Sequence, residues 1–108
     1  MANYYSDHPE FDFYLNHPEM KRVVELKERN FADKDKYEDA PVDFDDAIEN
    51  YKRVLDITGD IAANILEPNS EAVDLEGPHL VEGRMHYASK TYENIEATRQ
   101  AGLWGISM

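Results

Sequence analysis

The stretch DFDDAIENYKRVLDITGDIAANILEP, residues 43–68, decides the fold, because its apolar side chains recur at the spacing of one helical face. Asp43 is a favoured N-cap residue, and the acidic residues after it complement the helix dipole. Gly59 is tolerated inside the helix at a cost of about 1 kcal/mol. Proline disfavours helical backbone at the residue before it, so Pro68 predicts that the helix ends near Leu66 or Glu67. The side chains expected to face the core are Phe44, Ala47, Ile48, Tyr51, Leu55, Thr58, Ala62, Ile65 and Leu66.

Two similar helix starts precede this stretch, DHPE at residues 7–10 and NHPE at residues 16–19. Proline suits the first position of a helix, and an acidic residue in the first turn interacts favourably with the helix dipole. We therefore expect a short helix over residues 10–15 and a second helix over residues 18–30. The second helix is expected to bury Met20, Val23, Val24 and Leu26.

Residues 31–42 predict a loop that is rich in charge and ends at a proline. The aromatic side chains of Phe31 and Tyr37 are expected to hold this loop against the core.

After the long helix, residues 69–88 predict irregular structure with turns at Gly77-Pro78 and at Glu82-Gly83. Segments 79–81 and 84–86 flank the second turn and are expected to form a small hairpin. Ser89 is expected to cap a last helix, and Gly102 fits the position just after that helix, where glycine readily adopts positive φ. The side chains of this helix expected to face inward are Tyr92, Ile95 and Thr98.

The sequence thus predicts an all-α fold: a small helical domain with one long helix, two or three shorter helices and a small β-hairpin. The expected division places an N-terminal helical extension and acidic loop at residues 1–42, and a helical domain at residues 43–108.

Composition excludes several classes of protein. The 108 residues contain no cysteine, which excludes disulfides and thiolate chemistry. The formal net charge of −12 opposes binding to nucleic acid and to anionic membrane surfaces. No apolar run is long enough to span a membrane, and the N-terminus lacks the layout of a signal peptide, so we expect a cytoplasmic protein.

No motif of catalysis or metal binding stands out. His8 and His17 belong to the helix starts, and His79 and His86 lack the i,i+4 spacing of a helical zinc site. The acidic loop that begins at Asp33 does not fit an EF-hand, because aromatic residues occupy positions that need oxygen ligands. The serines have no nucleophile-elbow context, and no glycine-rich phosphate loop is present. We therefore predict neither catalytic, cofactor-binding nor metal-binding residues.

The last third of the chain carries a more specific pattern. LEPN at residues 66–69 is followed by Asp74, by the segment from Gly77 to Gly83, and by a helix that ends in QAGLWGIS at residues 100–107. This pattern resembles the N-terminal helical domain of the acyl-CoA dehydrogenases, and in particular the longer bacterial type, over residues 10–108. Residues 43–108 would then be the start of that domain. The chain ends on the apolar stretch Leu103 to Met108, so we expect that residues beyond it are missing.

The resemblance implies a flavin-dependent α,β-dehydrogenation of an acyl-CoA thioester in the full-length protein. FAD, acyl-CoA and an electron acceptor would be bound by the full-length protein, which is expected to be a homo-oligomer, and this fragment alone is expected to be inactive. Its partner would be the remainder of its own chain, with a structural role for Gly102, Leu103, Trp104, Gly105 and Ile106. Considered on its own, Trp104 is expected to be a core side chain.

The alternative is a stand-alone acidic helical interaction module, in which Leu103 to Met108 would form an exposed apolar patch that docks a partner. The two hypotheses differ in the length of the gene product. A module would end near Met108, whereas a dehydrogenase would continue well beyond it.

Overall fold

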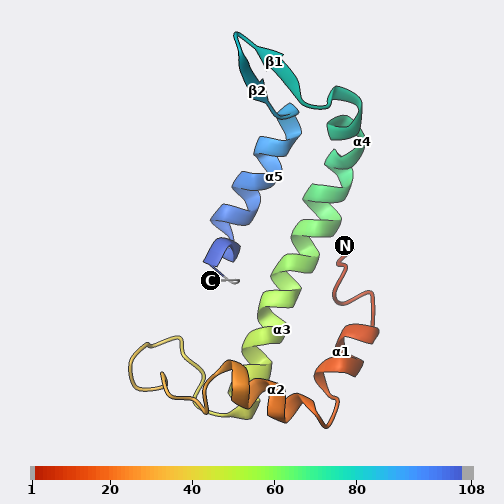
Figure 1. The fold of residues 1–108 in the computed structure, drawn as a ribbon. Coiled ribbons are helices and arrows are strands. Elements are labelled where there is room, and N and C mark those ends of the chain that lie inside the picture. Colours follow the sequence, from red (N-terminus) through yellow and green to blue (C-terminus); the bar gives the residue numbers. More distant parts are fainter. Residues whose placement is uncertain (1, 106–108) are drawn as a thin grey trace. The chain divides into compact units, whose positions relative to one another are not determined.

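The computed structural model describes residues 2–105. It is 60% helical, with one continuous helical run of 33 residues and a two-stranded antiparallel sheet, which confirms the predicted fold class. Five α-helices are present in the described residues (Figure 1): α1 (Glu10–Leu15), α2 (Met20–Lys27), α3 (Phe44–Ile61), α4 (Glu67–Glu76) and α5 (Ser89–Gln100). The other elements are a π-helical turn η1 (Ala62–Leu66), strands β1 (His79–Val81) and β2 (Arg84–His86), and a 3₁₀ turn η2 (Leu103–Gly105).

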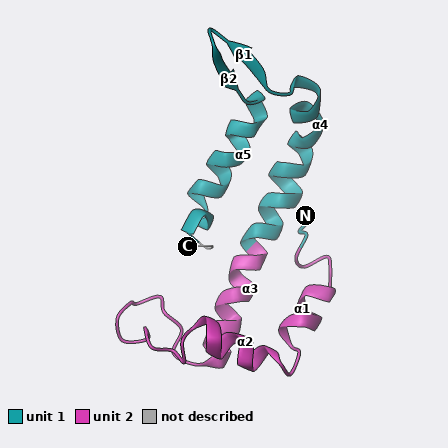
Figure 2. Cartoon of the chain, viewed as in Figure 1, with its two compact units in different colours: residues 1–4, 57–108 teal, residues 5–56 magenta. Residues whose placement is uncertain are grey.

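The chain forms two compact units, coloured separately in Figure 2. Unit 1 contains residues 1–4 and 57–108, and unit 2 contains residues 5–56. The boundary therefore falls inside α3, between Asp56 and Ile57. The division expected between residues 42 and 43 stays a prediction. No described helix is both long enough and apolar enough to cross a membrane.

In unit 2, the start of α3 is fixed by two aspartates. Asp43 acts as the N-cap, as predicted, because its Oδ1 accepts a hydrogen bond from the backbone N–H of Asp46 at 2.9 Å. The Asp46 carboxylate in turn accepts the backbone N–H of Val42 at 3.1 Å. The first bond satisfies one of the donors that a helix N-terminus leaves without partners, and the second ties the residue before the cap to the first turn of the helix.

Helix α1 matches its predicted bounds, but α2 is shorter than the expected residues 18–30. The chain leaves the right-handed helix after Glu28, because Arg29, Asn30 and Phe31 all have positive φ, of 50°, 56° and 61°. Three consecutive left-handed residues cannot continue an α-helix. The backbone N–H of Glu28 closes the helix on the carbonyl of Val24 at 2.8 Å.

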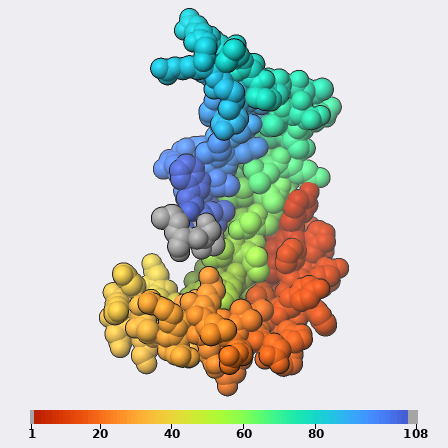
Figure 3. Space-filling model, viewed as in Figure 1, coloured from red at the N-terminus to blue at the C-terminus, as the bar shows by residue number. Residues whose placement is uncertain are grey.

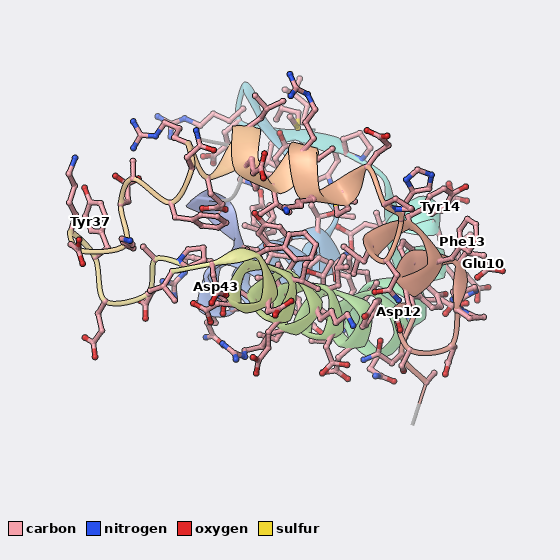
Figure 4. The ribbon with its side chains drawn as sticks, turned by 90° about the horizontal axis from the view of Figure 1, so that it is seen from below. Glu10, Asp12, Phe13, Tyr14, Tyr37 and Asp43 are labelled. Carbon is pink, nitrogen blue, oxygen red and sulfur yellow. The ribbon has the colours of Figure 1, made fainter. Side chains whose placement is uncertain are left out.

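The core of unit 2 is small. Val24 and Ala47 are fully buried, as predicted, whereas Val23 and Leu26 are 51% and 67% exposed and correct the expected core. Successive helical residues point about 100° apart, so only part of this apolar set can face α3 together with Val24. Tyr37 does not hold the loop to the core: it is 66% exposed and points away from the helices (Figure 4), because the loop around it supplies mainly charged neighbours.

A hydrogen bond links α2 to α3. The Tyr51 hydroxyl donates to Glu28 Oε1 at 2.6 Å, from the middle of the long helix to the residue that ends α2. Burial, followed by the hydrogen bond to the Glu28 carboxylate and that carboxylate's charge, raises the pKa of Tyr51 far above its ordinary value. Burial, with the hydrogen bond to Asp12 and the charges of Asp12 and Asp56, raises the pKa of Tyr5 to about 12.

In unit 1, the helix does not end at Pro68, which corrects the prediction from the sequence. The π-helical turn η1 precedes Pro68, and the backbone N–H of Glu67 bonds to the carbonyl of Ala62, five residues back. The wider turn relieves the clash between a proline ring and the carbonyl four residues earlier, and Pro68 takes a place in the first turn of α4, where its missing N–H costs little. Residues 69–76, expected to be irregular, are therefore helical.

The N-terminal segment of unit 1 lies beside this π-helical turn. The backbone N–H of Tyr4 donates to the carbonyl of Gly59 at 3.1 Å, and the Asn64 amide donates to the carbonyl of Ala2 at 2.8 Å. The Tyr4 hydroxyl donates to the Glu67 carboxylate. Residues 2–4 thus contact η1 and both helices that flank it, through polar groups.

Helices α4 and α5 of unit 1 pack side by side and are joined by the hairpin (Figure 1). The buried apolar residues of this unit are Ile61, Ala63 and Ala88. Asn69 is also buried and donates to Asn94 of α5 at 2.8 Å, so that a polar pair lies within the helix contact. The predicted inward side chains are corrected in three cases, because Thr58, Tyr92 and Ile95 are exposed; Thr98 is half-buried.

The raised pKa values of Tyr5 and Tyr51 in unit 2 predict a loss of stability in alkali. Because their pKa values are raised in the folded state, their contribution is complete below the unfolded value of about 10 and is lost as the pH rises through the folded values, for Tyr5 between pH 10 and about 12. Tyr51→Phe should lower the free energy of unfolding by about 1 kcal/mol at neutral pH and flatten its decline above pH 10, as measured by urea denaturation across this pH range.

Tyr37→Phe is the matched control, because the Tyr37 ring is exposed. It should leave the free energy of unfolding at neutral pH unchanged. An equal effect of the two variants would contradict the assigned role of the Tyr51 hydroxyl.

Candidate functional site

The hairpin of unit 1 is built by two turns that the sequence predicts correctly. Gly77 ends α4 with φ 63° and ψ 175°, a conformation that is essentially restricted to glycine. Glu82 and Gly83 both have positive φ, of 51° and 79°, as a two-residue type I′ turn requires. The strands pair with His79 opposite His86, Leu80 opposite Met85 and Val81 opposite Arg84. All six strand residues are exposed, and the hairpin is the cyan segment at the surface in Figure 3.

The carboxylate of Glu76 caps α5. It accepts the backbone N–H of Ser89 at 2.7 Å and the Ser89 hydroxyl at 3.0 Å. This corrects the prediction that Ser89 is the cap: Ser89 is the first helical residue, and the cap comes from the last residue of α4. A carboxylate at a helix N-terminus also interacts favourably with the helix dipole. One side chain therefore joins the two helices that flank the hairpin.

A cavity of about 330 Å³ lies where α4, the hairpin and α5 meet. Its lining is mostly apolar and offers only hydroxyl groups as side-chain polar atoms. The lining residues are Val73, Gly77, Pro78, Met85, Tyr87, Ala88 and Thr91. Such a cavity can hold an apolar group, but it presents no carboxylate, imidazole or amine for acid–base chemistry.

Four exposed apolar and aromatic side chains continue from this cavity, and we call them the hairpin patch: Leu80, Met85, Tyr87 and Tyr92. Leu80 is 73% exposed and lies opposite Met85 in the strand register. Met85 and Tyr87 both line the cavity, and the ring of Tyr87 lies 6.0 Å from that of Tyr92. Isolated exposed apolar residues are ordinary, but a connected group beside a cavity is typical of an interaction surface.

The structure places four of the five predicted structural residues. Gly102 has φ 75° and follows α5 as expected, Leu103 is half-buried, and Gly105 is exposed; Ile106 lies outside the described residues. Trp104 is 57% exposed, so it is not the core residue expected from its type. Its indole N–H donates to Thr98 Oγ1 at 3.1 Å. This hydrogen bond holds the exposed ring against α5. Burial of this segment by further chain stays a prediction.

Sequence reasoning missed the pairing of two histidines. His79 and His86 are opposite each other in the hairpin, and their rings are stacked with centroids 5.9 Å apart. The i,i+4 spacing applies to helical pairs, whereas the two-residue turn at Glu82-Gly83 is the signal that sets these residues in register. Within residues 2–105, no group of three or more His, Asp or Glu side chains is arranged to hold a metal ion.

Comparison of the chain with protein-family models, curated proteins and solved structures found no match. The resemblance to the acyl-CoA dehydrogenases therefore depends on the residues quoted for it alone.

The conformation of Gly77 generates a test of the hairpin's geometry. Gly77→Ala should lower the free energy of unfolding by about 1–3 kcal/mol, because a side chain is strained at this φ and ψ. Gly105→Ala is the matched control: an added Cβ meets no atom within 4 Å at either position, and only Gly77 has positive φ. Chemical denaturation of both variants measures the difference, and equal values would refute the assigned strain.

The Glu76 cap generates a second test. Glu76→Ala should reduce the protection of the first-turn amides of α5 from hydrogen exchange and cost about 1 kcal/mol of stability, because the Ser89 N–H loses its acceptor. Glu71→Ala, an exposed substitution in the same helix, should leave these amides unchanged. Unchanged exchange in Glu76→Ala would show that the cap contributes nothing.

Proposed function

We infer that this chain is a scaffold domain whose hairpin patch is covered by further polypeptide of the same protein, which we propose to be a flavin-dependent acyl-CoA dehydrogenase. The observation that carries the scaffold role is the connected exposure of the hairpin patch beside an apolar cavity. The proposed occupant is the remainder of the protein's own chain.

The energetics favour such a cover. Full burial of one large apolar side chain stabilises by about 1.5–3 kcal/mol, so the burial of four such side chains amounts to several kcal/mol. The described core of unit 1 contains three buried apolar residues, two of which are alanine. Unit 1 therefore exposes larger apolar side chains than most of those it buries. This supports the proposal that its hairpin patch packs against further polypeptide.

The family assignment depends on the pattern that ends in AGLWGI at residues 101–106. Under this assignment, the full-length protein would dehydrogenate an acyl-CoA thioester with FAD and pass the electrons to an acceptor. The proposal includes a homo-oligomeric, cytoplasmic protein. Under this proposal the hairpin cavity contributes shape rather than chemistry, because its lining offers no acid–base group.

The cavity near the hairpin does not fit FAD. The mostly apolar cavity near the hairpin has no cationic side chain in its lining and no glycine-rich loop for a pyrophosphate. FAD would therefore be bound by other parts of the full-length protein, and we assign no flavin contact to this chain.

A stand-alone interaction module is the alternative function. The exposure of Trp104, together with the hairpin patch, favours it, because aromatic side chains at a surface are common anchors of protein interfaces. A partner that meets an acidic chain of net charge −12 would carry a basic rim around its apolar contact.

The experiment that separates the two functions is performed on the product of the native gene, purified from its source. A protein much larger than 12.5 kDa, with a flavin absorption band that acyl-CoA bleaches, is the expected result. A colourless product of 12.5 kDa would exclude the dehydrogenase and leave the interaction module.

The cover over the hairpin patch has a test of its own. Leu80→Asp should be almost neutral in the isolated 108-residue chain, because Leu80 is 73% exposed there. In the full-length product, the same substitution should cost about 2 kcal/mol or more, because it would bury a charge in an apolar contact. Tyr37→Asp, in the exposed loop of unit 2, is the control. Equal effects of Leu80→Asp in the two proteins would contradict the cover.

A further inference from the structure

The outward face of the hairpin places two imidazoles together. His79 and His86 are directly opposite in the strand register, and their rings lie 5.9 Å apart with an interplanar angle of 18°. Alternate residues of a strand point to opposite faces, so these side chains lie on the face away from Leu80 and Met85. Both histidines are exposed, which leaves space for an ion and for the water that completes its coordination.

The separation suits a shared metal ion. With a bond of about 2.1 Å from zinc to nitrogen, the centre of each imidazole lies about 3.2 Å from the ion, and two tetrahedral ligands then place their ring centres about 5.2 Å apart. The observed separation of 5.9 Å is close to this value. The rings are stacked, so their side-chain torsions must turn to bring one nitrogen of each toward the ion, and exposed side chains make such turns at little cost.

In the conformation observed, the surroundings of His79 favour one tautomer of its imidazole. His79 Nδ1 lies 3.5 Å from the carbonyl oxygen of Gly77, and a carbonyl can only accept a hydrogen bond. It also lies 3.9 Å from Glu76 Oε2. These two acceptors favour the proton on Nδ1 and leave the lone pair on Nε2. A ligating histidine whose other nitrogen faces a carbonyl or a carboxylate is the usual arrangement around protein-bound zinc.

We propose that His79 Nε2 and His86 form a two-histidine site for a divalent transition-metal ion of the zinc class. Imidazole nitrogen suits zinc, copper and nickel, whereas calcium and magnesium prefer oxygen ligands. Water molecules complete the coordination. The bound ion cross-links β1 to β2 and so holds the hairpin closed. The site does not depend on the acyl-CoA dehydrogenase assignment.

The test uses the 108-residue chain, freed of metal with a chelator and titrated with zinc chloride at neutral pH. We expect saturation at one ion per chain. In long-range ¹H–¹⁵N spectra, the imidazole nitrogens of His79 and His86 should shift, and those of His8 and His17 should not. Excess calcium should not displace the zinc, because calcium competes for carboxylates and not for imidazoles.

Four substitutions make the test specific. His79→Gln and His86→Gln should each lower the affinity for zinc about tenfold or more, whereas the matched controls His8→Gln and His17→Gln should leave it unchanged. The cross-strand contact between Leu80 and Met85 in the metal-free variants, observed as a nuclear Overhauser effect, verifies that the hairpin still forms. An equal loss in all four variants, displacement by calcium, or no saturable binding would overturn the proposal and leave the histidine pair as a stacking contact.

Discussion

The backbone's passage through Pro68 is the constraint on which unit 1 depends. Proline has no N–H to donate and clashes with the carbonyl four residues earlier, and the π-helical turn η1 absorbs this conflict. A π turn adds one residue, which rotates every later side chain by about 100° about the helix axis. The face of α4 that carries Asn69 toward Asn94, and Val73 toward the cavity, is therefore set by the turn before Pro68. Had the helix ended there, α5 would have lost its main partner.

Glu76 fixes the start of α5 relative to the end of α4. It is the last residue of α4, and it holds the first N–H of α5, while its carboxylate lies 3.9 Å from His79 Nδ1. Gly77 then takes a conformation that other residues rarely adopt, and this turns the chain into β1. The hairpin is too short for independent stability, because an isolated two-stranded hairpin is marginal in water. Its place depends on the helix ends that the Glu76 carboxylate joins.

Local signals in the sequence predicted most of the elements, and long-range contacts account for the failures. The N-cap at Asp43, the turn at Glu82-Gly83 and the glycine after α5 depend on neighbouring residues alone, and all three are confirmed. The burial predicted for Leu26 and Ile95 failed because apolar character does not show which helical face has a partner. The local pattern predicted Ser89 as the cap of α5. The side chain that accepts the first N–H of this helix belongs to Glu76, 13 residues earlier, where a local pattern does not reach. The continuation of the helix through Pro68 was missed because the prediction allowed for α-helical geometry only.

The two faces of the hairpin have different chemistry, and strand alternation keeps them apart. Leu80 and Met85 lie on the face that continues the apolar cavity, while His79 and His86 lie on the opposite face. A polypeptide that covers the first face leaves the imidazoles open to solvent and to an ion. The same alternation also couples the two faces. A register slip of one residue would turn both sets of side chains to the wrong face. An ion bound by His79 and His86 would fix the register and so keep Leu80 opposite Met85. The metal site would thus stabilise the surface that further polypeptide is proposed to cover, without touching it.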